Sequence, residues 1–472
     1  MHDKDPQRSS PGNASTRPGP APQDDRPVWV RLSSLAWPII GINVLTVLAL
    51  AVDTAMCGRL PEHESALTGL GFATQVSFLL MVAMMGLTVG TIATVARAYG
   101  SGHGERIAHV LRQSSQLTIL LGLCVATGGN LVAEPILEAL GASGSNLEEG
   151  LRYLRPMLTG SAFTYLLILY GAVCRGVGNT RLPFAVSAVQ NLLNFLFNYG
   201  LILGNYGLPG LGVQGAAIGT IASQAIAVTL MVVLLKRNAL PQIELLLTPA
   251  PLDKQLASNL IRVGTPAGLD MLILNASFLS IVGMLGRIDD LSVAAHGIGL
   301  RIQALAFVPG MSIAQATGAL VGQALGAGSV SNANKVVRAS IVMATVVMST
   351  LAMAIIGAAE PIVSLFDIAA GSPLSVLTVT WMKVLGYGLP IVGFTISMVG
   401  MLQGAGATNT SLRINIWATL AVQIPLSWIL GFPLGLGAFG VWLAFPLSFI
   451  IKAVMLGYAW REGSWAKTGE EI

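Results

Sequence analysis

Charged residues are scarce in this sequence. Asp, Glu, Lys and Arg make up only 10% of the 472 residues, whereas 53% are hydrophobic. An average soluble domain carries about 25% charged residues, so this composition excludes an ordinary water-soluble protein. The composition instead favours a chain whose surroundings are largely lipid.

Cysteine and histidine are also few. The three cysteines, Cys57, Cys124 and Cys174, are far apart, and the five histidines show no metal-ligand spacing. We therefore expect no disulfide framework, no metal site and no cofactor. The polar loops 61–65 and 204–210 are too short for the side-chain cluster of a membrane-bound transferase. These absences favour a transporter with no catalytic residues over an enzyme.

The first thirty residues are polar and rich in proline, without a long apolar run. A secretory signal peptide needs an apolar stretch of about 7–15 residues, which is missing. We therefore expect residues 1–30 to form a disordered cytoplasmic tail and the first membrane helix to direct insertion.

Long apolar runs fill the rest of the chain. A spanning helix needs about 20 mostly apolar residues, and the sequence predicts an all-α integral membrane protein of about twelve transmembrane helices. The predicted spans are 33–58, 66–97, 107–131, 149–174, 181–204, 212–235, 257–286, 291–324, 334–358, 374–403, 410–432 and 437–460. The longest polar break between spans, residues 237–255, is predicted to be a cytoplasmic loop between two lobes. The predicted domains are therefore an N-terminal lobe 31–236, this inter-lobe loop, a C-terminal lobe 256–460 and a cytoplasmic tail 461–472.

The distribution of basic residues predicts the orientation. Of the 26 Lys and Arg residues, 19 fall on the side of the N-terminus and five on the other side. Because basic residues accumulate on the cytoplasmic side, both termini are expected in the cytoplasm.

The two halves of the chain resemble each other. Gly58-Arg59 recurs 228 residues later as Gly286-Arg287, and Ala133-Glu134-Pro135-Ile136 recurs 226 residues later as Ala359-Glu360-Pro361-Ile362. Further matches follow in the same order, which chance similarity would not maintain. The halves are therefore predicted to be two parallel six-helix repeats, an N-lobe and a C-lobe, around a central cavity, as in many transporters.

Two acidic residues fall inside predicted spans and not at their first or last residue, and a charge inside a span is costly. Asp53 lies toward the outer end of the first span, and its repeat counterpart is the apolar Ile281. Repeat symmetry therefore does not explain the carboxylate. We interpret Asp53 as a protonatable or cation-binding residue; the alternative is an interfacial residue facing water near Arg59.

The fifth span carries a row of amides. Asn191, Asn194 and Asn198 share one face at spacings of three and four residues, and Thr220 lies in the next span. Such groups hold a carboxylate, a hydronium ion or a cation, but they also tie helices together. The row as a whole favours a site.

The second acid inside a span is Asp270. Arg301 lies in the next span, and because unpaired charges are rare inside membranes, we expect a structural ion pair between them. A direct role of Asp270 in ion coupling is the alternative. Lys452, in the last span, is expected to extend to the cytoplasmic edge.

Several segments together resemble multidrug and toxic compound extrusion (MATE) antiporters over nearly the whole chain. In the first span these are Trp37-Pro38 and the segment from Val52 to Leu60. The eighth span resembles the family from Ala294 to Gly328, and Cys174–Thr180 with the Asn194 and Asn198 row resembles the end of helix 4 and helix 5.

The resemblance implies a protein of the bacterial inner membrane that exports amphipathic, often cationic compounds, driven by inward movement of protons or sodium ions. Asp53 matches the helix 1 carboxylate that is central to ion coupling, and Pro38 matches a proline proposed to bend. Asn194 and Thr220 match polar residues of the N-terminal cavity. Asn198 stands where one branch of the family has an acid.

The sodium-type branch has a helix 7 glutamate where Leu274 stands and a helix 10 aspartate near Val392, Phe394 and Thr395. Neither acid is present, so proton coupling through Asp53 is expected and sodium coupling is the alternative. A lipid-linked sugar flippase of the same superfamily would need several cavity arginines, and only Arg301 lies deep in a span. The expected partners are organic cations or amphipathic drugs, H+ or Na+, and the lipid bilayer, without nucleic acid, for a monomer.

Overall fold

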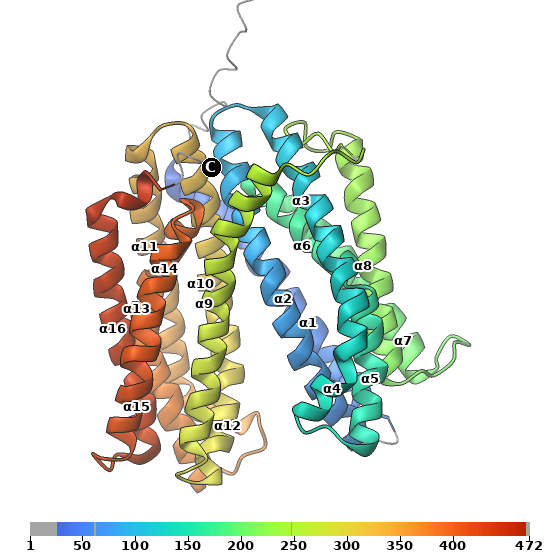
Figure 1. Cartoon of the computed structure of the whole chain (residues 1–472). Coiled ribbons are helices and arrows are strands. Elements are labelled where there is room, and N and C mark those ends of the chain that lie inside the picture. The colour runs from blue at the N-terminus through green and yellow to red at the C-terminus, as the bar shows by residue number, and fades with distance from the viewer. Residues whose placement is uncertain (1–25, 61–62, 247, 469–472) are drawn as a thin grey trace, which may run out of the picture.

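Long apolar helices build most of the molecule (Figure 1). The computed structural model describes residues 26–60, 63–246 and 248–468, and this part contains no β-strand. Eleven described helices are long and apolar enough to span a membrane, and the number is twelve when one bent pair counts as a single span. The predicted all-α membrane fold is therefore confirmed. Most of the predicted N-terminal tail lies outside the described residues.

The first half of the chain forms six spans, which we call the N-lobe. The pair α5 and α6 is bent by 54°, at Gly160. Pro156, in the last turn of α5, lacks a backbone N–H and weakens the helix just before this bend. The elements are α1 (Val28–Cys57), α2 (His63–Gly100), α3 (Gly104–Cys124), the π-helix η1 (Val125–Gly129), α4 (Asn130–Ala139), α5 (Gly144–Thr159), α6 (Ser161–Gly176), α7 (Arg181–Leu203) and α8 (Val213–Lys236).

The second half, the C-lobe, repeats this plan. Its elements are α9 (Lys254–Leu285), α10 (Asp290–Gly326), α11 (Val330–Gly357), α12 (Ala359–Ser364), α13 (Pro373–Gly404), α14 (Thr408–Asn415), the π-helix η2 (Ile416–Gln423), α15 (Ile424–Gly431), α16 (Gly437–Glu462) and the 3-10 turn η3 (Ser464–Ala466). The sequence did not predict the short α12. Nor is the segment after residue 461 simply a tail, because Trp465 is buried in the C-lobe core.

Helix α1 packs on both lobes. In its first half, Leu32, Leu35 and Ile39 are buried in a core built mainly by α10, α11 and α13 of the C-lobe. In its last turn, Met56 and Cys57 belong to an N-lobe core instead. The helix therefore crosses from one lobe to the other along its length.

Helix α9 makes the reciprocal crossing. Leu256 and Leu260 are buried in an N-lobe core with α3 and α6, whereas Ile281 and Leu285 pack in the C-lobe. The predicted lobe boundaries at residues 236 and 256 thus separate the two halves of the sequence, but α1 and α9 each pack in cores of both lobes. This exchange couples each lobe to the first helix of the other.

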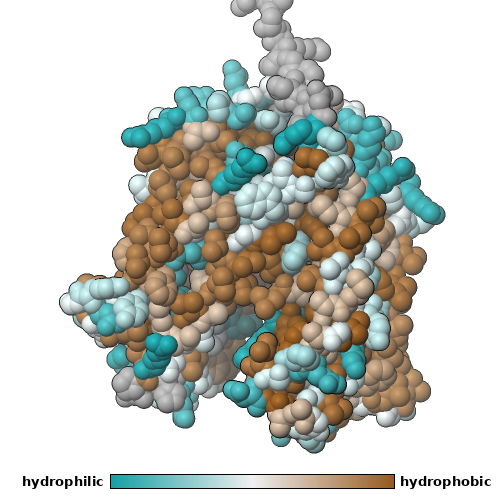
Figure 2. Space-filling model, turned by 180° about the vertical axis from the view of Figure 1, so that it is seen from behind, coloured by the Kyte–Doolittle hydropathy of each residue, from teal (hydrophilic) through white to brown (hydrophobic). Residues whose placement is uncertain are grey.

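The lobes meet at the end where α1 begins and α16 ends, which we call the terminal end. There an Arg97 Nη2 donates to the Ala405 carbonyl at 2.8 Å, and Gln323 Nε2 donates to the Gly176 carbonyl at 2.9 Å. At the opposite end the helices of the two lobes diverge (Figure 1), and Figure 2 shows the surface hollowed between them. The protein is therefore closed at the terminal end and open at the opposite end.

Candidate functional site

Asp53 lies one turn before the end of α1, within a span and toward the open end. Its side chain is half-buried, and Asn198 Nδ2 on α7 donates a hydrogen bond of 2.6 Å to its Oδ1. No ion pair with Arg59 occurs among the described residues. The carboxylate is thus held by an amide from a second helix and not by a basic side chain.

Asn198 is fixed in place by the close approach of α7 and α8. It is fully buried, and a Cβ atom added to Gly219 on α8 would overlap its Oδ1. That Oδ1 has no hydrogen-bond partner in the described part of the chain. Because Gly219 has no Cβ, there is room for Asn198 Oδ1 beside α8. In this orientation the amide N–H group of Asn198 faces Asp53.

The other amides of the predicted row have different contacts. Asn194 Nδ2 donates to Thr220 Oγ1 on α8 at 3.0 Å, so these two candidate residues lie together. Asn191 Nδ2 donates to the Ser187 carbonyl of its own helix at 2.8 Å and does not reach Asp53. Of the three amides in this row, Asn198 alone is hydrogen-bonded to the carboxylate.

Pro38 is buried in α1, which continues through it as a helix. Because proline has no N–H group, the Ser34 carbonyl lacks its usual helical partner and α1 is weakened at this point. Five residues further on, Asn43 Nδ2 donates to Ser312 Oγ of α10 at 3.0 Å. This link between the lobes was missed in the sequence, where the only signal was an amide in an apolar span.

The predicted ion pair between Asp270 and Arg301 is wrong. Arg301 is exposed on α10, and the described contacts of Asp270 do not include it. Asp270 Oδ2 instead accepts a hydrogen bond of 2.8 Å from Ser411 Oγ. Lys452 was also assigned wrongly to the membrane edge, because its Nζ donates to Asn415 Oδ1 at 2.9 Å, inside the lobe.

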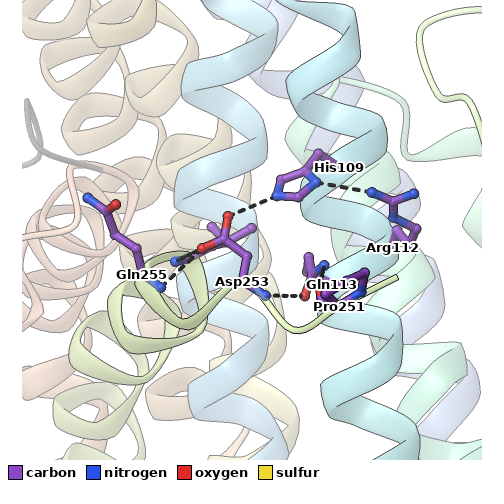
Figure 3. Close-up of polar contacts among 7 residues, drawn as sticks. His109, Arg112, Gln113, Pro251, Asp253 and Gln255 are labelled. Atoms are coloured by element: carbon purple, nitrogen blue, oxygen red, sulfur yellow. Dashed lines mark hydrogen bonds and ion pairs between the residues drawn. The ribbon is translucent and has the colours of Figure 1, made fainter. Parts of the chain in front are cut away.

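A second polar cluster fastens the inter-lobe loop to α3 (Figure 3). Gln113 Nε2 donates to the Pro251 carbonyl at 2.9 Å, and its Oε1 accepts from the Asp253 N–H at 3.1 Å. His109 Nδ1 accepts from Arg112 at 3.4 Å, so Nε2 carries the proton that points to Asp253 Oδ2 at 3.0 Å. The loop is thus bound to the N-lobe just before α9 begins.

Asp253 also caps α9. Its Oδ1 accepts hydrogen bonds of 3.0 Å from the N–H groups of Gln255 and Leu256. The bond from Leu256 first, and then that from His109, hold the pKa of the Asp253 carboxyl below its usual value. The anionic carboxylate is therefore the form that joins loop, α3 and α9.

These features define a class of protein. Two six-span repeats, hollowed between the lobes, with a carboxylate and amides inside the spans, form a polytopic membrane transporter. The MatE family model matches residues 38–200 and again 266–429, once in each half. The chain belongs to the MATE family of multidrug efflux transporters.

Named relatives agree with this assignment. The probable multidrug resistance protein NorM of Thermotoga maritima is 25% identical over 92% of this chain and 93% of its own length. A protein of Shewanella oneidensis named FAD transporter is 25% identical over 88% of this chain and 91% of its own length. The fold is similar to the outward-facing conformation of a multidrug resistance MATE family transporter, with a TM-score of 0.85, 22% identity and coverage of 93% and 97%.

Proposed function

We propose that this protein exports amphipathic, mostly cationic compounds in exchange for protons, with Asp53 as the coupling carboxylate. The observation that carries the proposal is the contact of Asp53 with Asn198 inside a span, without a basic partner among the described residues. The negative charge of a carboxylate inside a span is unfavourable, and it can be neutralised either by a proton or by a bound organic cation. The two ligands therefore compete for Asp53.

Competition between these two ligands provides the coupling. When Asp53 takes a proton its charge is lost, and its attraction for a cationic compound weakens. Linkage requires the reverse as well, so a bound cation disfavours protonation. Rocking of the two lobes about α1 and α9 would then expose the site alternately at the two ends of the molecule.

The orientation of this cycle is part of the proposal. We infer that the terminal end faces the cytoplasm of a bacterium and that the open end faces outward, because 19 of the 26 basic residues are predicted on the side of the N-terminus. In a cysteine-free background, Leu208→Cys at the open end should react with an impermeant maleimide in intact cells. Glu462→Cys should react only after the cells are permeabilised, and the opposite pattern would reverse the orientation.

Reconstituted protein tests the exchange itself. Proteoliposomes loaded with a fluorescent organic cation such as ethidium are given either a proton gradient or a sodium gradient of equal size. Flux that follows the proton gradient supports the proposal. Flux that follows sodium alone would replace protons by sodium as the coupling ion, and no flux with either gradient would contradict cation antiport.

A further inference from the structure

A pocket of about 680 Å³ lies at the terminal end of the C-lobe, between α11, the end of α16 and the turn η3. The chain forms it by reversing direction at Gly463, which ends α16 with a φ of 76°, a conformation that glycine adopts without strain. Trp465 thereby folds back into the C-lobe core, and its Nε1 donates to the Trp460 carbonyl at 3.1 Å. Trp460 Nε1 in turn donates to Asn334 Oδ1 on α11 at 2.8 Å. These two hydrogen bonds fix the wall of the pocket.

Three basic side chains line this pocket, and no acid is among the described residues that line it. Lys335 and Arg338 come from α11, and Arg461 comes from the last turn of α16. All three are exposed, and none has an ion pair within the part of the chain that the structure describes. Glu462, the next residue in the sequence, is exposed and does not line the pocket. Like charges held this close repel one another, so an anion between them is favourable.

The helix faces that carry these charges continue into exposed apolar surface. On α11, Val342 and Val346 follow Arg338 at spacings of four residues, so they share its face, and both are exposed. On α16, the exposed Val454 lies two turns before Arg461 on the same face. In a chain that spans a membrane, exposed apolar side chains of this kind face the acyl chains of lipids. The surface therefore combines a basic pocket with apolar tracks that lead away from it.

The aromatic wall of the pocket indicates its depth in the membrane. Trp460 is half-buried and directly precedes the charged end of α16. Tryptophan is enriched at the boundary between the hydrocarbon and the lipid headgroups, because its ring is apolar and its N–H group needs a partner. Basic pockets between membrane helices at this depth are typical binding sites for acidic lipid headgroups. A soluble anion would use the pocket but not the apolar faces of α11 and α16.

We propose that this pocket binds the phosphate headgroup of an anionic phospholipid from the membrane leaflet at the terminal end. Lys335, Arg338 and Arg461 hold the phosphate, for which guanidinium groups are suited by shape and charge. The acyl chains lie along the exposed apolar faces of α11 and α16. The bound lipid ties α11 to the C-terminal turn η3. This site goes beyond the proposed transport activity and does not rest on it.

The test titrates purified full-length protein with phosphatidylglycerol or with phosphatidylcholine that carries the same acyl chains. Native mass spectrometry gives the affinity of the first bound lipid. The variant Arg338→Gln/Arg461→Gln removes two charges of the pocket. The matched control, Lys236→Gln/Arg237→Gln, removes two exposed basic residues at the end of α8 in the N-lobe.

The wild type should bind phosphatidylglycerol more tightly than phosphatidylcholine. One basic residue near an anionic lipid surface contributes about fivefold to affinity, so the pocket variant should bind phosphatidylglycerol about 25-fold more weakly. The control should bind it like the wild type. If the pocket variant cannot be purified, Lys335→Gln/Arg338→Gln takes its place.

A loss of affinity in the pocket variant alone supports the site. Equal affinities of the pocket variant and the control, or equal affinities of the wild type for the two lipids, would overturn it. Glycerol 3-phosphate in excess should leave the lipid bound, because it has no acyl chains. Its displacement of the lipid would also overturn the inference, since the pocket would then take a soluble phosphate compound. No substrate flux is measured, so the result is independent of the proposed antiport.

Discussion

The contact between Asn198 and Asp53 can be removed without changing either residue. A methyl group at Gly219 would overlap Asn198 Oδ1 and force the amide to turn. The variant Gly219→Ala should therefore separate Asn198 Nδ2 from Asp53 Oδ1, which lie 2.6 Å apart in the wild type. The substitution keeps every charged and polar side chain of the site.

The size of the effect follows from the type of bond. A hydrogen bond to a charged group contributes about 1.5–3 kcal/mol, so its loss should lower proton-driven efflux about 10- to 150-fold. The replacement of glycine by alanine inside a helix favours the helix itself by about 0.8–1.0 kcal/mol. A general loss of stability is therefore not the expected cause of the lower activity.

The assay is initial efflux of ethidium from proteoliposomes under a fixed proton gradient. Gly71→Ala on α2, where an added Cβ meets nothing within 4 Å, is the matched control and should transport like the wild type. Asn198→Ala added to Gly219→Ala should cause little further loss, because both changes break the same bond. Wild-type efflux by Gly219→Ala would refute the reasoning, since the amide contact would then be dispensable.

Three further predictions concern the lobe contacts. A methyl group at Gly264 would overlap the Gly86 carbonyl of α2, so Gly264→Ala should force the two helices apart and open the terminal end. A cysteine placed at that end should then react faster with maleimide. Gly283→Ala is the control and should not change the rate, because an added Cβ meets nothing within 4 Å there. The pKa of Asp253 is lowered, so its ionised carboxylate stabilises the attachment of the loop to α3 and α9. This stabilisation is fully present above the usual aspartate pKa of about 4 and is lost as the pH falls through the lowered pKa. Hydrogen-exchange protection of residues 250–256, corrected for intrinsic rates, should fall accordingly, and constant protection down to pH 2 would contradict this. His109→Ala should lower the same protection at neutral pH, and an unchanged exchange rate would show that its bond to Asp253 is dispensable.

The helices were predictable because length and apolarity are local properties of the sequence. The lipid solvent requires long apolar helices, so span positions followed from composition alone. The pairing of Asn194 with Thr220 was also within reach, because both belong to adjacent spans with regular spacing. Periodicity shows which residues share a helix face, and the next helix in the chain is often the neighbour.

The partners of Asp270 could not be predicted in this way. Ser411 and Asn415, whose side chains are hydrogen-bonded to Asp270, lie 141 and 145 residues further along the chain, and no spacing rule joins them to it. Nearness in sequence suggested Arg301 instead, which is exposed. The crossing of α1 and α9 between the lobes was hidden for the same reason, because an apolar helix face does not specify which core buries it.

The most direct test of proton coupling is Asp53→Asn in proteoliposomes, with Asp290→Asn, an exposed acid at the start of α10, as the control. Ethidium efflux is measured under a proton gradient, together with proton movement in the opposite direction. Proton coupling through Asp53 predicts that both fluxes vanish in Asp53→Asn and persist in Asp290→Asn. Proton-driven efflux at the wild-type rate in Asp53→Asn would contradict it.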